Sequence, residues 1–283
     1  MIKRAKSELA THAVVFIIFA ALAFSYLFIL IWCFAAGMRT HADVVLRPFD
    51  IDWGALRLRN YLEVFSMLEV GQAGFGRMLF NSLYFSLLGP FLNIMVTMML
   101  AYVTTKYKFF GSKAYFYVVL ITMMLPIFGN GGAAYRLMTR LRFINSYALV
   151  LTSLSGMGLG YMYFNAFFRT VSATYAEAAE IAGANDWQIF FRVILAQTIP
   201  LAGSMYLLAW IGDWNNFAGY LIYLPKIPTL SVGIYLFNSQ MTYYARMDIL
   251  FGASFISVIP PLILFVCFNN VLLSNLSLGG IKE

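Results

Sequence analysis

Six long stretches of this chain contain almost no Asp, Glu, Lys or Arg. A helix rises about 1.5 Å per residue, so about 20 apolar residues cross the hydrocarbon core of a bilayer. Only 11% of the 283 residues are charged, against roughly 25% in soluble domains. The pattern predicts an all-α integral membrane protein, with a single domain over residues 1–283 and six transmembrane helices. The expected spans are 13–37, 78–103, 114–135, 146–168, 199–222 and 249–273.

The charges at the start of the chain predict its orientation. Lys3, Arg4 and Lys6 precede the first apolar run, which is too long for a signal peptide and lacks a clear cleavage site. The first helix usually dominates the positive-inside rule, so we expect a retained first span with the N-terminus in the cytoplasm. An even number of spans then places the C-terminus there too. Seven arginines, Arg136 among them, would lie outside, so the support from charge asymmetry is weak.

Several function classes are disfavoured by what the sequence lacks. The net charge is +7, but the basic residues are scattered and form no dense patch for nucleic acid. No G-x-x-x-x-G-K-[ST] phosphate loop is present, and the two histidines, His12 and His41, belong to no catalytic set. Cys33 and Cys267 lie in apolar runs without metal-ligand spacing. We therefore expect a non-catalytic chain with no cofactor or metal of its own.

The segment 169–200 is too polar to cross a bilayer and too apolar to be a free loop. Ala173–Ala182 is rich in Ala and Glu, which favour helix, and Gly183 can end that helix in the left-handed conformation. Asp186 is expected to cap a second helix that starts at Trp187. This predicts a helix–turn–helix on the membrane surface, or a simple amphipathic closure of the bundle. The expected apolar face of the second helix comprises Trp187, Phe190, Phe191 and Ile194.

This segment resembles the EAA loop of binding-protein-dependent ABC transporter permeases, in their carbohydrate (maltose-type second permease) branch. The match comprises Glu177-Ala178-Ala179, Gly183-Ala184, Trp187–Phe190, Val193, Leu195 and Pro200. Three positions depart from the family pattern. Ala182 replaces an Asp, Asn185 replaces a Ser, and Ala196 replaces a Pro.

Other parts of the chain are similar to the same family. The Asn81-Ser82 pair, Pro126, the W-N-x-F sequence at Trp214–Phe217 and the tail 279–283 all match. The resemblance implies the six-helix fold of ABC type I importer permeases and a place in the cytoplasmic membrane of a bacterium or archaeon. It also implies that the chain moves a sugar or oligosaccharide across that membrane.

The resemblance further implies several partners. They are a second permease subunit, two ATP-binding cassette subunits that use ATP and Mg, an extracytoplasmic solute-binding protein, and membrane lipid. The residues expected to couple to the ATPase are Glu177, Ala178, Ala179, Gly183, Ala184, Asp186 and Trp187.

Polar residues inside membrane spans are costly and are default candidates for function. The candidates for the substrate pathway are Asn81, Asn130, Trp210, Asp213, Trp214, Asn215 and Asn216. The alternative for each is that it satisfies backbone or a neighbouring helix. The stretch 227–245 is expected to be a loop or interfacial segment, similar to the family's external loop. Its expected binding-protein contacts are Asn238, Ser239, Gln240 and Met241.

Two other functions compete with sugar import. One is an ABC permease for another solute, such as a peptide or an anion. The other is a secondary transporter, for which inverted repeats are typical. The sequence shows no matching halves.

Overall fold

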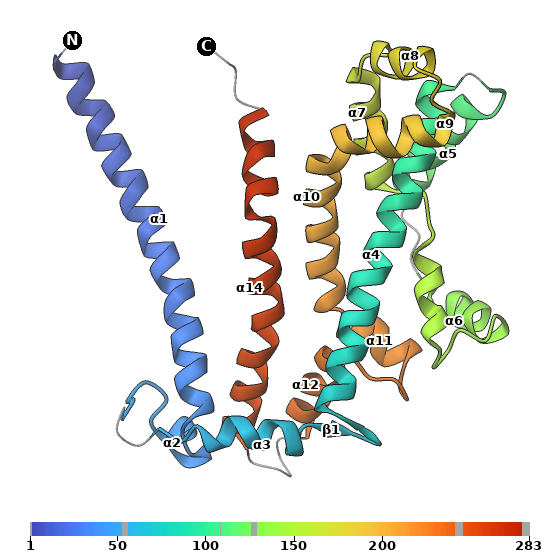
Figure 1. The fold of residues 1–283 in the computed structure, drawn as a ribbon. Coiled ribbons are helices and arrows are strands. Elements are labelled where there is room, and N and C mark those ends of the chain that lie inside the picture. Colours follow the sequence, from blue (N-terminus) through green and yellow to red (C-terminus); the bar gives the residue numbers. More distant parts are fainter. Residues whose placement is uncertain (1, 53–55, 108, 126–128, 241–245, 279–283) are drawn as a thin grey trace. The chain divides into compact units, whose positions relative to one another are not determined.

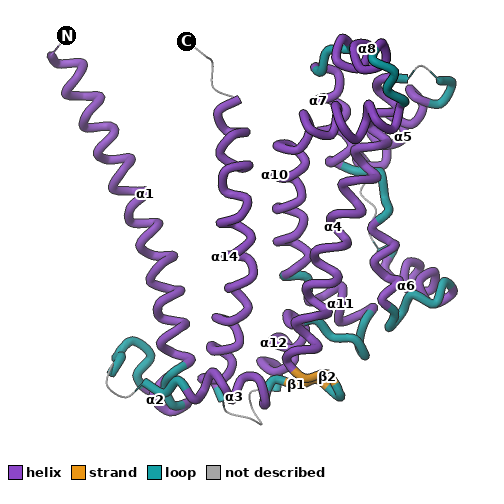
Figure 2. The backbone as a smooth tube through the Cα atoms, viewed as in Figure 1, coloured by secondary structure: helices purple, strands orange, loops and turns teal. Residues whose placement is uncertain are grey.

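The computed structural model describes residues 2–52, 56–107, 109–125, 129–240 and 246–278, and they are mostly helical (Figures 1 and 2). The all-α class is confirmed, with one small exception. Strands β1 (Glu69–Val70) and β2 (Ala73–Gly74) form a short antiparallel hairpin that turns at Gly71, where φ is +60°.

The helices follow one another along the chain with short connections. They are α1 (Ile2–Gly37), α2 (His41–Leu46), α3 (Arg59–Met67), α4 (Phe75–Lys106), α5 (Ser112–Met124), α6 (Gly131–Arg140), η1 (Tyr147–Ser153, 3-10), α7 (Leu159–Thr170), α8 (Thr174–Ile181), α9 (Asp186–Gln188), η2 (Ile189–Ile194, π), α10 (Leu195–Trp214), α11 (Phe217–Tyr223), α12 (Leu230–Ser239) and α14 (Met247–Leu278).

Within the part of the chain that the structure describes, four helical runs are long and apolar enough to cross a membrane. They are Leu9–Gly37, Phe75–Lys106, Asp186–Trp214 and Met247–Phe268. These runs contain the first and second expected spans and most of the fifth and sixth, and α14 continues beyond Phe268.

The third and fourth expected spans differ from the prediction. The third is interrupted, because α5 ends at Met124 and α6 begins only at Gly131. The fourth consists of the 3-10 turn η1 and the 12-residue helix α7, which begins after Gly158 at a φ of +113°. The count of six spans stays a prediction, as does the single domain over 1–283.

The chain folds into two compact units. The first comprises 1–76 and 233–259, and the second comprises 77–232 and 260–283. In the first unit, α1 packs against the start of α14, where the Trp32 and Phe251 rings meet edge-on at 4.9 Å. Arg246 joins α14 to α3 through a 2.7 Å ion pair with Glu63.

The second unit has a core of aromatic and aliphatic side chains. Met98 and Tyr102 of α4 pack with Phe164 and Phe168 of α7 and with Phe190 of η2, and all five are buried. Within this unit, α8 and α9 lie at one end of α4 and α10, and α6 and α11 lie at the other (Figure 1). The candidates on α8 and α9 therefore lie at one end of the second unit, and those beside α11 lie at the other.

Within 227–245, expected as a loop or interfacial segment, residues 230–239 form the helix α12, so a loop is the wrong prediction there. Burial explains the difference, since Leu230 and Val232 are each about 1% exposed. The Leu230 amide at the helix start also donates a 2.7 Å hydrogen bond to the Ser82 hydroxyl of α4. Met241, Pro126 and the tail 279–283 lie outside the described residues.

Candidate functional site

The first candidate site is the segment 169–200, which we call the coupling segment. Its first helix, α8, ends in a turn that satisfies the backbone carbonyls left free at a helix end. Ala184 N donates to Ala179 O at 3.0 Å, and Gly183 N donates to Glu180 O at 2.9 Å. Gly183 adopts a φ of +83°, as predicted from the sequence. This pair of bonds is the Schellman arrangement, and it fixes the angle at which the chain leaves α8.

The second helix of the coupling segment starts one residue earlier than expected. Asn185, not Asp186, is its cap. The Asn185 side chain accepts from Gln188 N at 2.9 Å, and the Gln188 side chain accepts from Asn185 N at 3.0 Å. This reciprocal capping box satisfies two amides at once. Asp186 becomes the first helical residue and accepts a hydrogen bond from the Tyr107 hydroxyl at 3.1 Å.

The expected apolar face of that second helix is divided by the structure. Phe190 and Ile194 are buried in the core of the second unit, together with Ile189. Trp187 and Phe191 stay 63% and 42% exposed, and their rings stack at 6.0 Å. The widened π-turn η2 over Ile189–Ile194 explains the split, because the predicted face assumed regular α-helical spacing.

The coupling segment also exposes side chains that the sequence analysis did not single out. Ile181, the last residue of α8, is 89% exposed, and Tyr175 is 56% exposed. The expected coupling residues Glu177 and Ala178 are exposed beside them in sequence, whereas Ala179 packs partly against the core. The sequence feature that could have indicated the exposed Ile181 is its position directly before the Ala182-Gly183 helix end. The segment thus presents a firmly folded surface of apolar and acidic groups.

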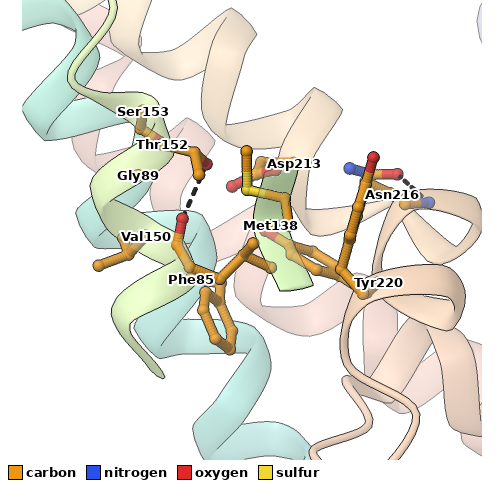
Figure 3. Close-up of a pocket in the computed structure, with 12 residues that line it drawn as sticks. Phe85, Gly89, Met138, Val150, Thr152, Ser153, Asp213, Asn216 and Tyr220 are labelled. Carbon is orange, nitrogen blue, oxygen red and sulfur yellow. Dashed lines mark hydrogen bonds between the residues drawn. The ribbon is translucent and has the colours of Figure 1, made fainter. Parts of the chain in front are cut away.

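The second candidate site is a cavity of about 330 Å³ at the other end of the second unit (Figure 3). Asp213 in the last turn of α10 points into it, together with Asn216 and Tyr220 from the start of α11. The remaining lining comes from α4, α6, η1 and α11, with Phe85, Gly89, Met138, Leu149, Val150, Thr152, Ser153, Gly219 and Tyr223.

The Asp213 carboxylate shares the cavity with side chains from the next helix. Those of Tyr220 and Asn216 line the cavity together with it. On its other side it lies against the backbone of α4 at Gly89. A Cβ at residue 89 would lie 3.2 Å from Asp213 Oδ2 and 3.2 Å from Ser153 Oγ. The absence of a side chain at Gly89 therefore leaves room for the carboxylate.

The structure brings only two of the seven predicted pathway residues, Asp213 and Asn216, to this cavity. Asn81 is fully buried elsewhere, and its amide binds Pro228 O and the Tyr147 hydroxyl. The other predicted residues do not line the cavity either. Trp210 and Trp214 are buried and stack at 5.2 Å, Asn215 binds the carbonyl of Ile211, and Asn130 is exposed before α6.

The predicted binding-protein contacts lie at the end of α12. Asn238, Ser239 and Gln240 are all exposed there. The Ser239 hydroxyl donates to Leu236 O at 2.7 Å, which continues the helical turn. The structure therefore presents the three polar side chains at a helix end.

Comparison with known proteins agrees with this architecture. The chain is 28% identical over 267 residues to the arabinooligosaccharides transport system permease protein AraQ of Bacillus subtilis, covering 93% of each chain. It is 25% identical over 278 residues to the sulfoquinovosyl glycerol transport system permease protein SmoH of Agrobacterium fabrum, covering 94% of this chain and 93% of the other.

A solved structure shares the fold. It is a bacterial ABC transporter involved in the import of the acidic polysaccharide alginate, matched with a TM-score of 0.72 over 94% of this chain and 98% of the other, at 20% identity. The family described as binding-protein-dependent transport system inner membrane component matches residues 93–276. That match contains the whole coupling segment, α10 and most of the residues that line the cavity. The chain belongs to the family of inner membrane components of binding-protein-dependent transport systems.

Proposed function

We propose that this chain is a permease subunit of an ATP-driven importer that carries a sugar or oligosaccharide delivered by an extracytoplasmic binding protein. The relatives named for carbohydrate transport, aligned over nearly the whole chain, support the substrate class. In this proposal the chain is not an enzyme, and a separate subunit hydrolyses ATP with Mg. The chain sits in the cytoplasmic membrane with both termini in the cytoplasm.

The single observation that carries the proposal is the construction of the coupling segment. A Schellman turn and a capping box fix two helices at a defined angle, and Phe190 and Ile194 anchor the second helix in the core. Ile181 and Trp187 nevertheless stay exposed on this segment. Large apolar side chains held on a rigid exposed element are typical of a protein–protein contact.

The partner at this surface is the ATPase subunit. Closure of the ATPase would push on α8, and the buried second helix would pass the movement into α10. Glu177 is exposed and can pair with a basic group of the ATPase, where a hydrogen bond to a charged group contributes about 1.5–3 kcal/mol if it is buried. The chain carries one such segment, which favours assembly with a second, different permease and two ATPase subunits. Asn238, Ser239, Gln240 and Met241 would contact the binding protein.

Co-purification in mild detergent tests this proposal. The tagged chain, expressed in its own host, is expected to bring down an ATPase subunit and a second permease. Ile181→Glu should remove the ATPase and keep the second permease, because it places a charge in the proposed apolar contact. Leu46→Glu is the matched control, since Leu46 is 78% exposed on α2, far along the sequence from the coupling segment.

Two outcomes would count against the proposal. Retention of the ATPase by Ile181→Glu would show that the coupling segment is not the docking surface. Uptake that persists after ATP depletion, while the ion gradient holds, would favour a secondary transporter.

A further inference from the structure

Asp213 occupies a position where a carboxylate is costly. It lies in the last turn of α10, where the negative end of the helix dipole disfavours a negative side chain. It also lies in an apolar helical run long enough to cross a membrane. Among the described residues no Lys, Arg or His forms a salt bridge with it. Ionisable residues kept in such places usually serve a ligand or a transport pathway.

The groups around Asp213 leave part of its carboxylate available to a ligand. A carboxylate offers about four acceptor positions, more than the donors of the neighbouring Tyr220 hydroxyl and Asn216 amide could fill together. Gly89 adds no side chain on the α4 side. Figure 3 shows the Asp213 side chain among the residues that line the cavity. Acceptor positions therefore remain for a hydroxyl-bearing ligand.

The other residues that line the cavity provide side chains that suit the binding of a carbohydrate. Phe85, Tyr220 and Tyr223 supply aromatic surface, and Ser153 supplies a hydroxyl. None of the lining residues is Lys, Arg or His, so nothing in the lining would neutralise an anionic ligand. The volume of about 330 Å³ lies at the small end of the roughly 300–1,000 Å³ range of ligand pockets. The cavity is therefore large enough for one sugar ring and too small to hold several linked rings at the same time.

We infer that this cavity is a binding site for a single uncharged sugar ring and that Asp213 excludes acidic sugars from it. The inference rests on the proposed function and narrows its substrate class. The relatives and the matched structure are named for both uncharged and acidic carbohydrates, so their names do not decide the question. In a pocket that holds one ring, a carboxylate on that ring comes close to Asp213, and like charges at such distances repel strongly.

Saturation-transfer NMR on the purified permease complex, without the binding protein, tests the inference. Galactose and galacturonate form a matched pair, because they share the ring and differ in charge at one carbon. Wild type is expected to bind galactose at least about tenfold more tightly than galacturonate. Equal binding of the two sugars, or binding of neither, would overturn the inference.

Two substitutions of Asp213 separate charge from hydrogen bonding. Asp213→Asn keeps polar atoms of similar shape, so galacturonate binding should rise at least tenfold while galactose binding changes by less than about threefold. Asp213→Leu removes the acceptors, and binding of both sugars should be lost. Glu69→Gln removes an exposed carboxylate of the first unit and should leave the preference unchanged. A preference that survives in Asp213→Asn would refute the role of the charge.

Co-purification of the ATPase with each variant shows that the complex has folded and assembled. It also separates the two proposals. Equal binding of the two sugars by a wild-type complex that retains its ATPase would contradict only the sugar site, whereas absence of an ATPase from the wild-type complex would contradict the proposed function.

Discussion

Gly37 at the end of α1 and Gly252 in α14 bring two helix backbones into direct contact. A Cβ at residue 37 would lie 2.8 Å from the Cα of Gly252 and 2.9 Å from its backbone nitrogen. Small residues at such crossings allow membrane helices to pack closely without the hydrophobic effect. Because both atoms belong to backbone, neither can move aside by changing a rotamer.

Gly37→Ala should therefore separate the two helices and destabilise the first unit by about 1–3 kcal/mol, the usual effect of overpacking. Thermal unfolding of the purified protein in detergent measures the loss. Gly76→Ala is the control, because a Cβ there meets nothing within 4 Å. A melting temperature of Gly37→Ala equal to that of the control would contradict the close contact.

Asn81 connects three segments of the second unit. Its amide donates to Pro228 O at 2.8 Å, and its carbonyl accepts from the Tyr147 hydroxyl at 2.8 Å. Asn81→Leu should cost about 1–3 kcal/mol for each buried partner left unsatisfied. Tyr147→Phe removes only one of the two bonds and should have a smaller effect. Equal unfolding free energies for wild type and Asn81→Leu would show that this bridge does not stabilise the fold.

Gly183 holds the turn of the coupling segment at a φ of +83°. A side chain in the left-handed region costs about 1–2 kcal/mol, so Gly183→Val should loosen the turn and weaken ATPase co-purification. Gly132→Ala on α6 is the control, since its Cβ meets nothing within 4 Å and alanine favours helix. An unchanged yield of ATPase with Gly183→Val would mean that docking does not require this turn geometry.

Glu63 gives the first unit a dependence on pH. Its hydrogen bond with Arg246 lowers the pKa of the Glu63 carboxyl below its ordinary value of 4.5. Because folding lowers the pKa of Glu63, the ion pair stabilises the fold fully at any pH above the pKa that Glu63 has in the unfolded chain. This contribution is lost as the pH falls through the pKa that Glu63 has in the folded protein. Wild type should therefore lose more thermal stability than Glu63→Gln when the pH falls from 7 to about 3.

Glu69→Gln should follow the wild-type curve in that experiment, because Glu69 is an exposed carboxylate of β1 with no ion pair among the described residues. Parallel curves for wild type and Glu63→Gln would show that the pair with Arg246 does not contribute.

Local sequence signals predicted the coupling segment well where backbone chemistry decides the structure. Gly183 followed an Ala- and Glu-rich run, and only glycine reaches the left-handed conformation there without strain. The cap was displaced by one residue, because Asn185 and Asp186 both suit a helix start and only the position of Gln188 decides between them. The predicted apolar face of the second helix was wrong for a different reason. A π-turn cannot be recognised in a sequence pattern that is analysed at 3.6 residues per turn.

The sites that depend on long-range packing could not be predicted in the same way. Asn81 and Asp213 look alike in sequence, as polar residues in apolar runs. One is satisfied by Pro228, 147 residues away, and the other faces a cavity. Likewise, the stretch that holds α12 was expected to be a loop or interfacial segment because of its polar residues and Pro228. Burial of Leu230 and the hydrogen bond that its amide donates to the Ser82 hydroxyl stabilise it as a helix.

The helical run from Asp186 to Trp214 is continuous over 29 residues, so it measures roughly 40 Å. One end belongs to the coupling segment and the other carries Asp213. A rotation of this helix about its own axis would move the carboxylate relative to Tyr220 of α11 inside the cavity. Under the proposed function, ATPase movement at one end would then change the affinity for sugar at the other, without any separate relay between the two sites.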